Sequence, residues 1–254
     1  MRYCMQASLK RITRVPIAMF FDFFFPLMMI AVFAGGNSSQ TYGGISFINY
    51  FLPSAIMMGL IPLAFLSFPL SVGKQIEDGS LERLNYFGVK TRTILSSQIL
   101  TQIIFGVAGI ALDMLFSLAS FRLSFPNPGH FFAFLLQVFL GFLTLMVWGG
   151  VMALIVKKPQ ALMSVGLIVM FFLLFCAGTF GTLSAFPSAI QDVTKAFPVS
   201  YISNKLPLVW TGQAFWCVKF LWISAIWLAA GLALLFALSF SNKKLRANSF
   251  LRER

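Results

Sequence analysis

The chain has 254 residues, of which 59% are hydrophobic and only 10% are charged, and its formal net charge is +12. A water-soluble domain carries roughly 25% charged residues, so this composition excludes a protein whose whole surface faces water. The positive charge does not indicate nucleic-acid binding either, because the basic residues cluster between apolar runs and are not interleaved with the aromatic residues of a strand-binding surface.

Residues 1–16 predict an amphipathic helix on the inner membrane surface. Apolar residues recur there with the spacing of one helical face, and basic residues accompany them, as in helices that lie in the membrane interface. The basic residues of this segment include Lys10, Arg11 and Arg14. A plain basic flank of the first span is the alternative. Because more apolar runs follow instead of a soluble body, we interpret the first run as a retained span and not as a signal peptide.

Six apolar runs follow, each long enough to cross a hydrocarbon core about 30 Å thick. They cover residues 17–34, 50–72, 94–119, 131–156, 161–183 and 219–241. The strands of a membrane β-barrel would instead alternate in polarity over about 10 residues, and these runs do not. We therefore expect a single all-α polytopic transmembrane domain over residues 1–254.

The segments between the runs predict the orientation. If the N-terminus is inside, 15 of the 19 Lys and Arg residues fall on the inner side and four on the outer side. This is a positive-inside bias, and it places both termini in the cytoplasm.

Two carboxylates interrupt the runs: Asp22 in the first and Asp113 in the third. A charge at the centre of a span costs roughly 2.5–3.5 kcal/mol on insertion scales, so both are candidates for a substrate contact, a proton site or a hydrogen bond between helices. Asp22 lies in the inner part of its run, where a place near the headgroups is the alternative. Asp113 lies towards the outer half, where a purely structural contact is the alternative.

Residues 73–93 form the longest inner segment between two runs. Ser80 predicts the N-cap of a short helix that begins at Leu81, and Gly88 predicts its end. Such a helix is too short to be stable alone in water, so it needs the membrane surface or a partner protein. We expect a docking helix for a soluble partner; an ordinary solvated loop is the alternative.

Residues 184–206, after the fifth run, predict short helices on the outer side. Ser188–Phe197 is amphipathic and lies between Pro187 and Pro198. It is too polar and too short to cross the membrane, which indicates a helix at the interface.

Segment 74–84, KQIEDGSLERL, resembles the loop after the second span of ABC-2-type permeases. Further motifs typical of that family occur in the same order along the chain. They are Arg14-Val15-Pro16 before the first span, Pro26 inside its aromatic run, Pro53 at the start of the second span, and Pro198-Val199-Ser200-Tyr201 after the fifth.

The resemblance implies the membrane subunit of an ATP-binding-cassette exporter in the plasma membrane of a prokaryote. Two six-span permeases, here expected to be a homodimer, would pair in the lipid bilayer and bind two copies of a separate ATPase. That ATPase would hold ATP and Mg, and this chain would need no cofactor. The expected substrate is hydrophobic or amphipathic: a drug, a peptide such as a bacteriocin, or a lipid-linked glycan.

The resemblance also implies roles for individual residues. The ATPase-coupling residues would be Glu77, Asp78, Gly79, Ser80, Leu81, Glu82, Arg83 and Leu84. Short helices that re-enter the membrane after the fifth span would shape an outer gate with Pro187, Phe197, Pro198 and Tyr201. The substrate-pathway candidates are Asp22, Pro26 and Asp113.

The sequence offers little for other classes of function. It contains no G-x-x-x-x-G-K-[ST] motif, so a separate polypeptide would have to bind ATP. It has one histidine, His130, and its three cysteines form no C-x-x-C pair, so we expect no catalytic residue, metal site or nucleic-acid contact. An ion-coupled secondary transporter is the alternative, although it would need paired ionisable residues and broken helices near the membrane midplane.

Overall fold

The computed structural model describes residues 16–37, 39–42, 44–89, 91–156, 158–179 and 188–252. The helix expected over residues 1–16, with Lys10, Arg11 and Arg14, lies outside these ranges except for Pro16. Within them, six helical segments are long and apolar enough to cross a membrane: Pro16–Gly36, Phe47–Glu77, Thr93–Phe121, Pro128–Val156, Pro159–Cys176 and Val218–Leu238. Lipid offers no partner to the backbone, so an apolar span must satisfy its own N–H and C=O groups as a helix. The predicted all-α, six-span fold is confirmed.

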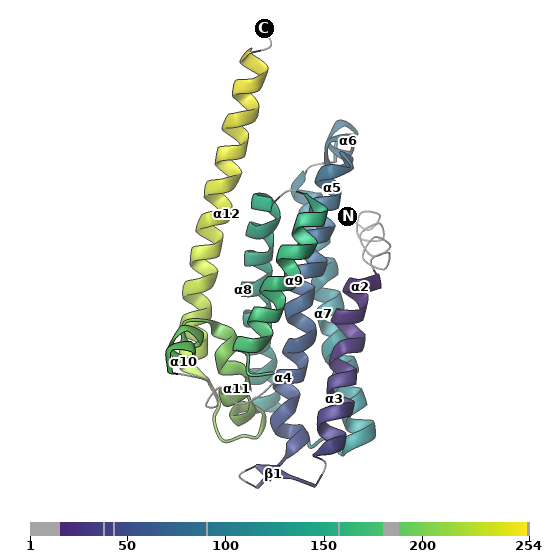
Figure 1. Ribbon diagram of the computed structural model, residues 1–254, viewed down its shortest axis with the longest axis vertical. Helices are drawn as coiled ribbons and strands as arrows, with labels where there is room; N and C mark the ends of the chain where they lie inside the picture. Colours follow the sequence, from purple (N-terminus) through teal and green to yellow (C-terminus); the bar gives the residue numbers. More distant parts are fainter. Residues whose placement is uncertain are drawn as a thin grey trace.

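The elements follow one another along the chain as labelled in Figure 1. The first span comprises α2 (Pro16–Met19), the π-helix η1 (Phe20–Phe24) and α3 (Phe25–Gly36). The second comprises α4 (Phe47–Pro62), the π-helix η2 (Leu63–Ser67) and α5 (Phe68–Glu77). The remaining spans lie in α7 (Thr91–Phe121), α8 (Pro128–Val156), α9 (Pro159–Cys176) and α12 (Val218–Arg252).

Short elements connect the spans. Strands β1 (Thr41–Tyr42) and β2 (Ile45–Ser46) form an antiparallel hairpin between the first and second spans. Helix α6 (Ser80–Tyr86) lies between the second and third. Helix α10 (Ser188–Lys195), the 3-10 helix η4 (Pro198–Tyr201) and α11 (Ile202–Trp210) precede the sixth.

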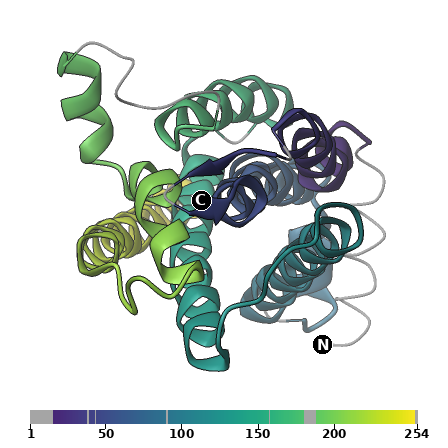
Figure 2. The same cartoon turned by 90° about the horizontal axis from the view of Figure 1, so that it is seen from below.

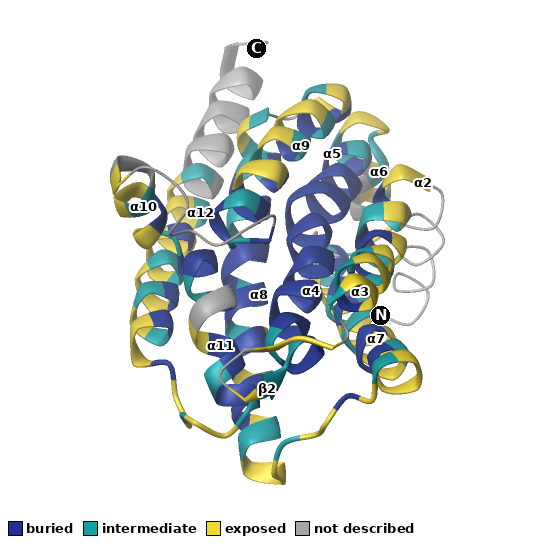
Figure 3. Ribbon diagram, turned by 60° about the horizontal axis from the view of Figure 1, so that its bottom comes forward, coloured by how far each residue is buried: buried dark blue, intermediate teal, exposed yellow. Residues whose placement is uncertain are grey.

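The second span is the centre of the bundle. Its most apolar stretch is entirely buried, and α4 and α5 form the dark blue core in Figure 3. Seen along the bundle in Figure 2, α4 is surrounded by the other spans, whereas α12 lies at the edge, where it packs on α8. The faces of α12 that remain exposed carry large apolar side chains such as Trp222, Ile226 and Phe236, which suit lipid or another protein surface.

The bundle has two distinct ends. Helix α6 and the C-terminal part of α12 lie at one end, and the β1–β2 hairpin and α11 lie at the other (Figure 1). We call them the α6 end and the hairpin end. Helix α12 has 35 residues, which at the α-helical rise corresponds to about 52 Å, so it extends well beyond a hydrocarbon core about 30 Å thick.

Both π-helical segments precede a proline that removes a backbone hydrogen bond. Pro26 cannot donate to the carbonyl of Asp22, and Pro69 cannot donate to that of Phe65, so each helix widens there and leaves one carbonyl without its usual partner. Glycines of neighbouring spans cover the two freed carbonyls. A Cβ atom on Gly59 would lie 2.9 Å from the Asp22 oxygen, and one on Gly166 would lie 2.6 Å from the Phe65 oxygen. The spans therefore approach closely at these two points.

Two predicted span ends differ from the structure by at least five residues, and the other boundaries agree more closely. The second span continues as a helix to Glu77 instead of ending near residue 72, so the inner segment 73–93 begins with the last turn of α5. The fifth span ends at Cys176 and not at residue 183. Gly178, with a φ of +69°, turns the chain, and the N–H groups of Ala177 and Thr179 donate back to the carbonyls of Leu173 and Leu174.

Candidate functional site

Helix α6 is the candidate coupling element at the α6 end of the bundle. Gly79, with a φ of +62°, reverses the chain directly after α5, and Gly88, with a φ of +82°, follows the end of α6. The helix packs against α5 and α7. Its C-terminal side presents two neighbouring aromatic side chains, Tyr86 and Phe87, which are 90% and 77% exposed and whose ring centroids lie 6.0 Å apart.

The side chains around this turn point largely to solvent. Glu77, Asp78 and Arg83 are exposed and Leu84 is half-buried, whereas the side chains of Leu81 and Glu82 lie outside the described part of the structure. Ser80 does not cap α6 as predicted. It is the first residue of the helix, and its hydroxyl donates to the carbonyl of Gln75 over 3.3 Å. The reason is the turn at Gly79, whose carbonyl already accepts from the N–H of Arg83.

Asp22 is buried inside the bundle. It is 4% exposed, in the middle of η1, and its Oδ2 accepts a hydrogen bond of 2.5 Å from the hydroxyl of Ser67, the last residue of η2. This bond joins the two π-helical segments. Pro26, one turn further along, packs against Gly59 of the second span, where a Cβ atom would lie 3.0 Å from its Cγ.

The structure brings the two predicted aspartates to one cavity. Asp22 from the first span and Asp113 from the third line it together, and the second span contributes apolar residues and Gly59. Asp113 is 3% exposed. The sequence placed these carboxylates in different halves of the membrane, whereas in the structure both line the same cavity. Sequence periodicity within one run cannot reveal such a meeting.

The sequence analysis did not identify a set of buried polar side chains on the second and third spans. Six of them are at most 6% exposed: Ser71, Gln75, Ser97, Gln98, Thr101 and Gln102. The Nε2 of Gln98 donates to the hydroxyl of Ser71 over 3.2 Å. The available signal was the spacing of Ser67, Ser71 and Gln75, which puts three polar residues on one face of an otherwise apolar helix.

The segment proposed for the outer gate forms α10, η4 and α11 at the sixth span. The ring of Phe197 packs at a tilt against Trp227 of α12, with 5.1 Å between ring centroids, and edge-to-face against Phe172 of α9, at 5.5 Å. Pro198 is buried at the start of η4, and Pro187 lies outside the described residues. The expected helix Ser188–Phe197 ends at Lys195, two residues early, because Ala196 and Phe197 form tighter turns onto Val193 and Thr194.

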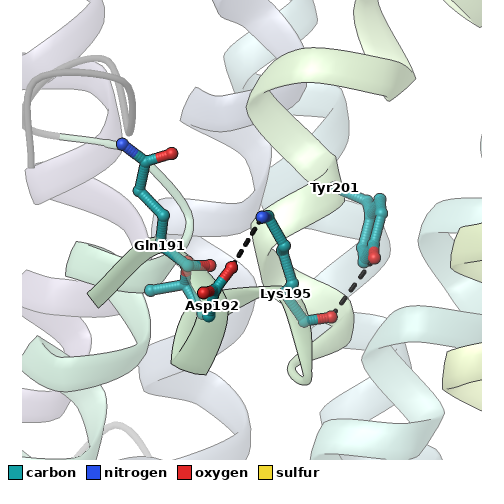
Figure 4. A network of polar contacts seen from close by, with 5 residues as sticks. Gln191, Asp192, Lys195 and Tyr201 are labelled. Atoms are coloured by element: carbon teal, nitrogen blue, oxygen red, sulfur yellow. Dashed lines mark hydrogen bonds and ion pairs between the residues drawn. The ribbon is translucent and has the colours of Figure 1, made fainter. Parts of the chain in front are cut away.

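A small polar network holds α10 beside η4 (Figure 4). The Nζ of Lys195 lies 2.8 Å from Oδ1 of Asp192, and the hydroxyl of Tyr201 donates to the carbonyl of Lys195 over 3.2 Å. The hydrogen bond and the charge of Asp192 raise the pKa of Lys195. Among the described residues no group of three His, Cys, Asp or Glu side chains is placed to hold a metal ion.

Comparison with known families identifies the fold. The family described as ABC-2 type transporter matches residues 1–206, which include the first five spans and α6 and end within α11. Comparisons with curated proteins and with solved structures found no match. Since the match covers most of the 254 residues, the chain belongs to the ABC-2 type transporter family and is the transmembrane component of an ABC transporter.

Proposed function

We propose that this chain is the permease subunit of an exporter in which a separate ATPase docks on α6. The observation that carries the proposal is the pair of exposed aromatic rings, Tyr86 and Phe87, at the end of a seven-residue helix. Exposed aromatic side chains of this kind are typical anchors of protein interfaces. Two ATPase copies, each with ATP and Mg, would supply the energy, because the family component itself is not catalytic.

The position of α6 supports a coupling role. Only Asp78 and Gly79 separate it from the second span, whose core is the most buried part of the bundle. A push on α6 would therefore reach the centre of the protein and not a peripheral helix. The exposed charged residues Glu77, Asp78 and Arg83 belong to the same turn and helix as the aromatic pair and would orient the partner, as rim charges do.

The remaining parts of the proposal follow from surface and charge. The exposed apolar faces leave room for a second copy of the chain in the membrane, and we propose a homodimer. We also propose that the α6 end and both termini lie in the cytoplasm of a prokaryotic cell, which the excess of Lys and Arg in the predicted inner segments supports. The substrate would be a hydrophobic or amphipathic drug, peptide or lipid-linked glycan, and α10, η4 and α11 would form its outer gate.

Copurification and transport together test the proposal. The full chain, tagged and expressed from its native neighbourhood, is purified in mild detergent and analysed for stoichiometric recovery of a P-loop ATPase. The complex is then reconstituted in liposomes, where ATP should drive efflux of a substrate. Ion-driven transport by the lone chain, without any ATPase, would instead support a secondary transporter and overturn the proposal.

A further inference from the structure

The cavity between the first three spans combines two carboxylates with apolar and glycine walls. Its lining includes Asp22, Gly59, Leu63, Gly106, Gly109 and Asp113. The cavity has a volume of about 10 Å³, which is enough for one water molecule. A substrate with a carbon skeleton is too large for this space.

Nothing on the cavity wall neutralises two negative charges. Ser67 satisfies one oxygen of Asp22, but its Oδ1 is buried and has no hydrogen-bond partner among the described residues. The elements packed against η1 contain three other titratable side chains: Tyr50, Arg92 and Asp113. Tyr50 lies in the first turn of α4, about 13 Å along that helix from Gly59. Arg92 lies in the first turn of α7, about 30 Å along that helix from Asp113.

Two ionised carboxylates without a counter-ion are costly in such surroundings, because burial removes the water that stabilises each charge. A metal ion is poorly suited to neutralise these two charges, because hard cations such as Ca²⁺ take about six to eight oxygen ligands. The other residues of the lining have apolar side chains or are glycines. A proton needs a single oxygen. A proton bound to the unpartnered Oδ1 of Asp22 would also turn that oxygen into a hydrogen-bond donor.

A column of polar side chains leads from this cavity to the α6 end. Ser67, Ser71 and Gln75 follow one another at four-residue intervals on the second span. Gln98 of α7 donates to Ser71, and Gln102 lies one turn further along α7 and is also buried. The side-chain oxygens of Gln75, Gln98 and Gln102 are buried and have no partner in the described part of the chain. Buried polar atoms of this kind are commonly satisfied by ordered water.

We propose that Asp22 and Asp113 form a proton-binding site inside the bundle, and that the column from Ser67 to Gln75 gives water access to it from the α6 end. A proton from water at that end adds to one carboxylate oxygen, and the neutral carboxyl releases it by the same route. The column ends at Gln75, two residues before the end of α5. The backbone carbonyl of Gln75 also accepts a hydrogen bond from the hydroxyl of Ser80 in α6. The site is independent of the proposed ATPase.

Carbodiimide labelling tests the site on the lone, full-length protein in detergent. Dicyclohexylcarbodiimide reacts with protonated carboxyl groups in apolar surroundings. Peptide mass spectrometry should find the adduct on Asp22 or Asp113 and less of it as the pH is raised, while the exposed Glu77 and Asp78 serve as controls and stay unmodified. If Asp22 and Asp113 both remain unmodified at every pH, the proton site is wrong. This experiment needs no variant to fold.

Infrared spectroscopy tests the site and its access route separately. The carbonyl band of a protonated carboxyl should be lost in Asp22→Asn or Asp113→Asn and kept in Glu77→Gln. In D₂O the band shifts as the proton exchanges, and Ser71→Ala with Gln98→Leu should slow this shift several-fold. Ser164→Ala, a polar change on α9 outside the column, is the matched control. An exchange rate equal to that of the unmodified protein would overturn the access route.

The outcomes are distinguishable from a failure of the proposed function. Because no ATPase is present, absent labelling leaves docking on α6 untouched. Conversely, variants of α6 that lose the ATPase should label at Asp22 or Asp113 like the unmodified protein.

Discussion

The indole N–H of Trp210 donates to Oδ1 of Asn49 over 3.1 Å, although 161 positions separate the two residues. The same oxygen accepts from the backbone N–H of Ser124 over 3.2 Å, and the Nδ2 of Asn49 donates to the hydroxyl of Ser46 over 2.7 Å. One side chain at the start of the second span thus ties α11 and the loop after α7 to the hairpin end of the bundle.

Asn49→Leu should destabilise the protein, because the change keeps the size of the side chain but leaves the Trp210 donor buried without an acceptor. An unsatisfied buried donor costs about 1–3 kcal/mol. Thermal unfolding in detergent should show a lower Tm. Ser164→Ala removes a hydrogen bond at an exposed position and should leave the Tm nearly unchanged. Equal Tm values for the two variants would contradict the bracing role of Asn49.

Gly166→Ala should destabilise the contact between the fifth and second spans. Its Cβ atom would lie 2.6 Å from the backbone oxygen of Phe65, which cannot yield as a flexible side chain does. Overpacking of this kind typically costs about 1–3 kcal/mol. Gly35→Ala is the matched control, since no atom lies within 4 Å of its Cβ position, and alanine favours a helix by about 1 kcal/mol over glycine. Denaturation in detergent compares the two, and a more stable Gly166→Ala variant would refute the close approach.

Tyr86→Asp combined with Phe87→Asp should abolish recovery of the ATPase with the purified chain, because a charged pair replaces the exposed aromatic anchors of α6. Membrane insertion and Tm should remain unchanged, since both side chains are exposed in the permease alone. Tyr86→Phe with Phe87→Leu keeps the apolar surface and is the control that should still bind. Normal ATPase recovery and transport in the Asp variant would exclude docking through these rings.

Asp192→Asn should lower the pKa of Lys195, because the hydrogen bond and negative charge of Asp192 raise it. The pairing favours the protonated amine, so its contribution is complete below the ordinary pKa of lysine and is lost as the pH rises through the raised value. NMR of isotopically methylated lysines measures the titration directly. The pair is exposed, so we expect no change in Tm, and an unaltered titration of Lys195 would show that the contact does not persist in solution.

Local features of the sequence were sufficient for the spans and for α6. The number of spans follows from the length of each apolar run, which the thickness of the membrane fixes independently of any partner helix. The end of α6 was predicted from Gly88, whose positive φ only a residue without a side chain adopts easily, whereas the start was assigned to a cap by Ser80 and lies instead at the turn of Gly79. The end of the fifth span was missed, because the residues after Gly178 remain apolar and hydropathy does not register a turn.

The sequence by itself determined that this protein is a six-span member of a transporter family, because hydropathy, charge bias and motif order are properties of the chain alone. Only the tertiary structure decided which polar residues share a space. Asp22 and Ser67 are 45 positions apart, and Asp22 and Asp113 are on different spans, yet all three meet where Pro26 opens one helix and Gly59 lets the next approach. Composition cannot distinguish a residue that faces lipid from one that faces a neighbouring helix, since both lie in equally apolar runs.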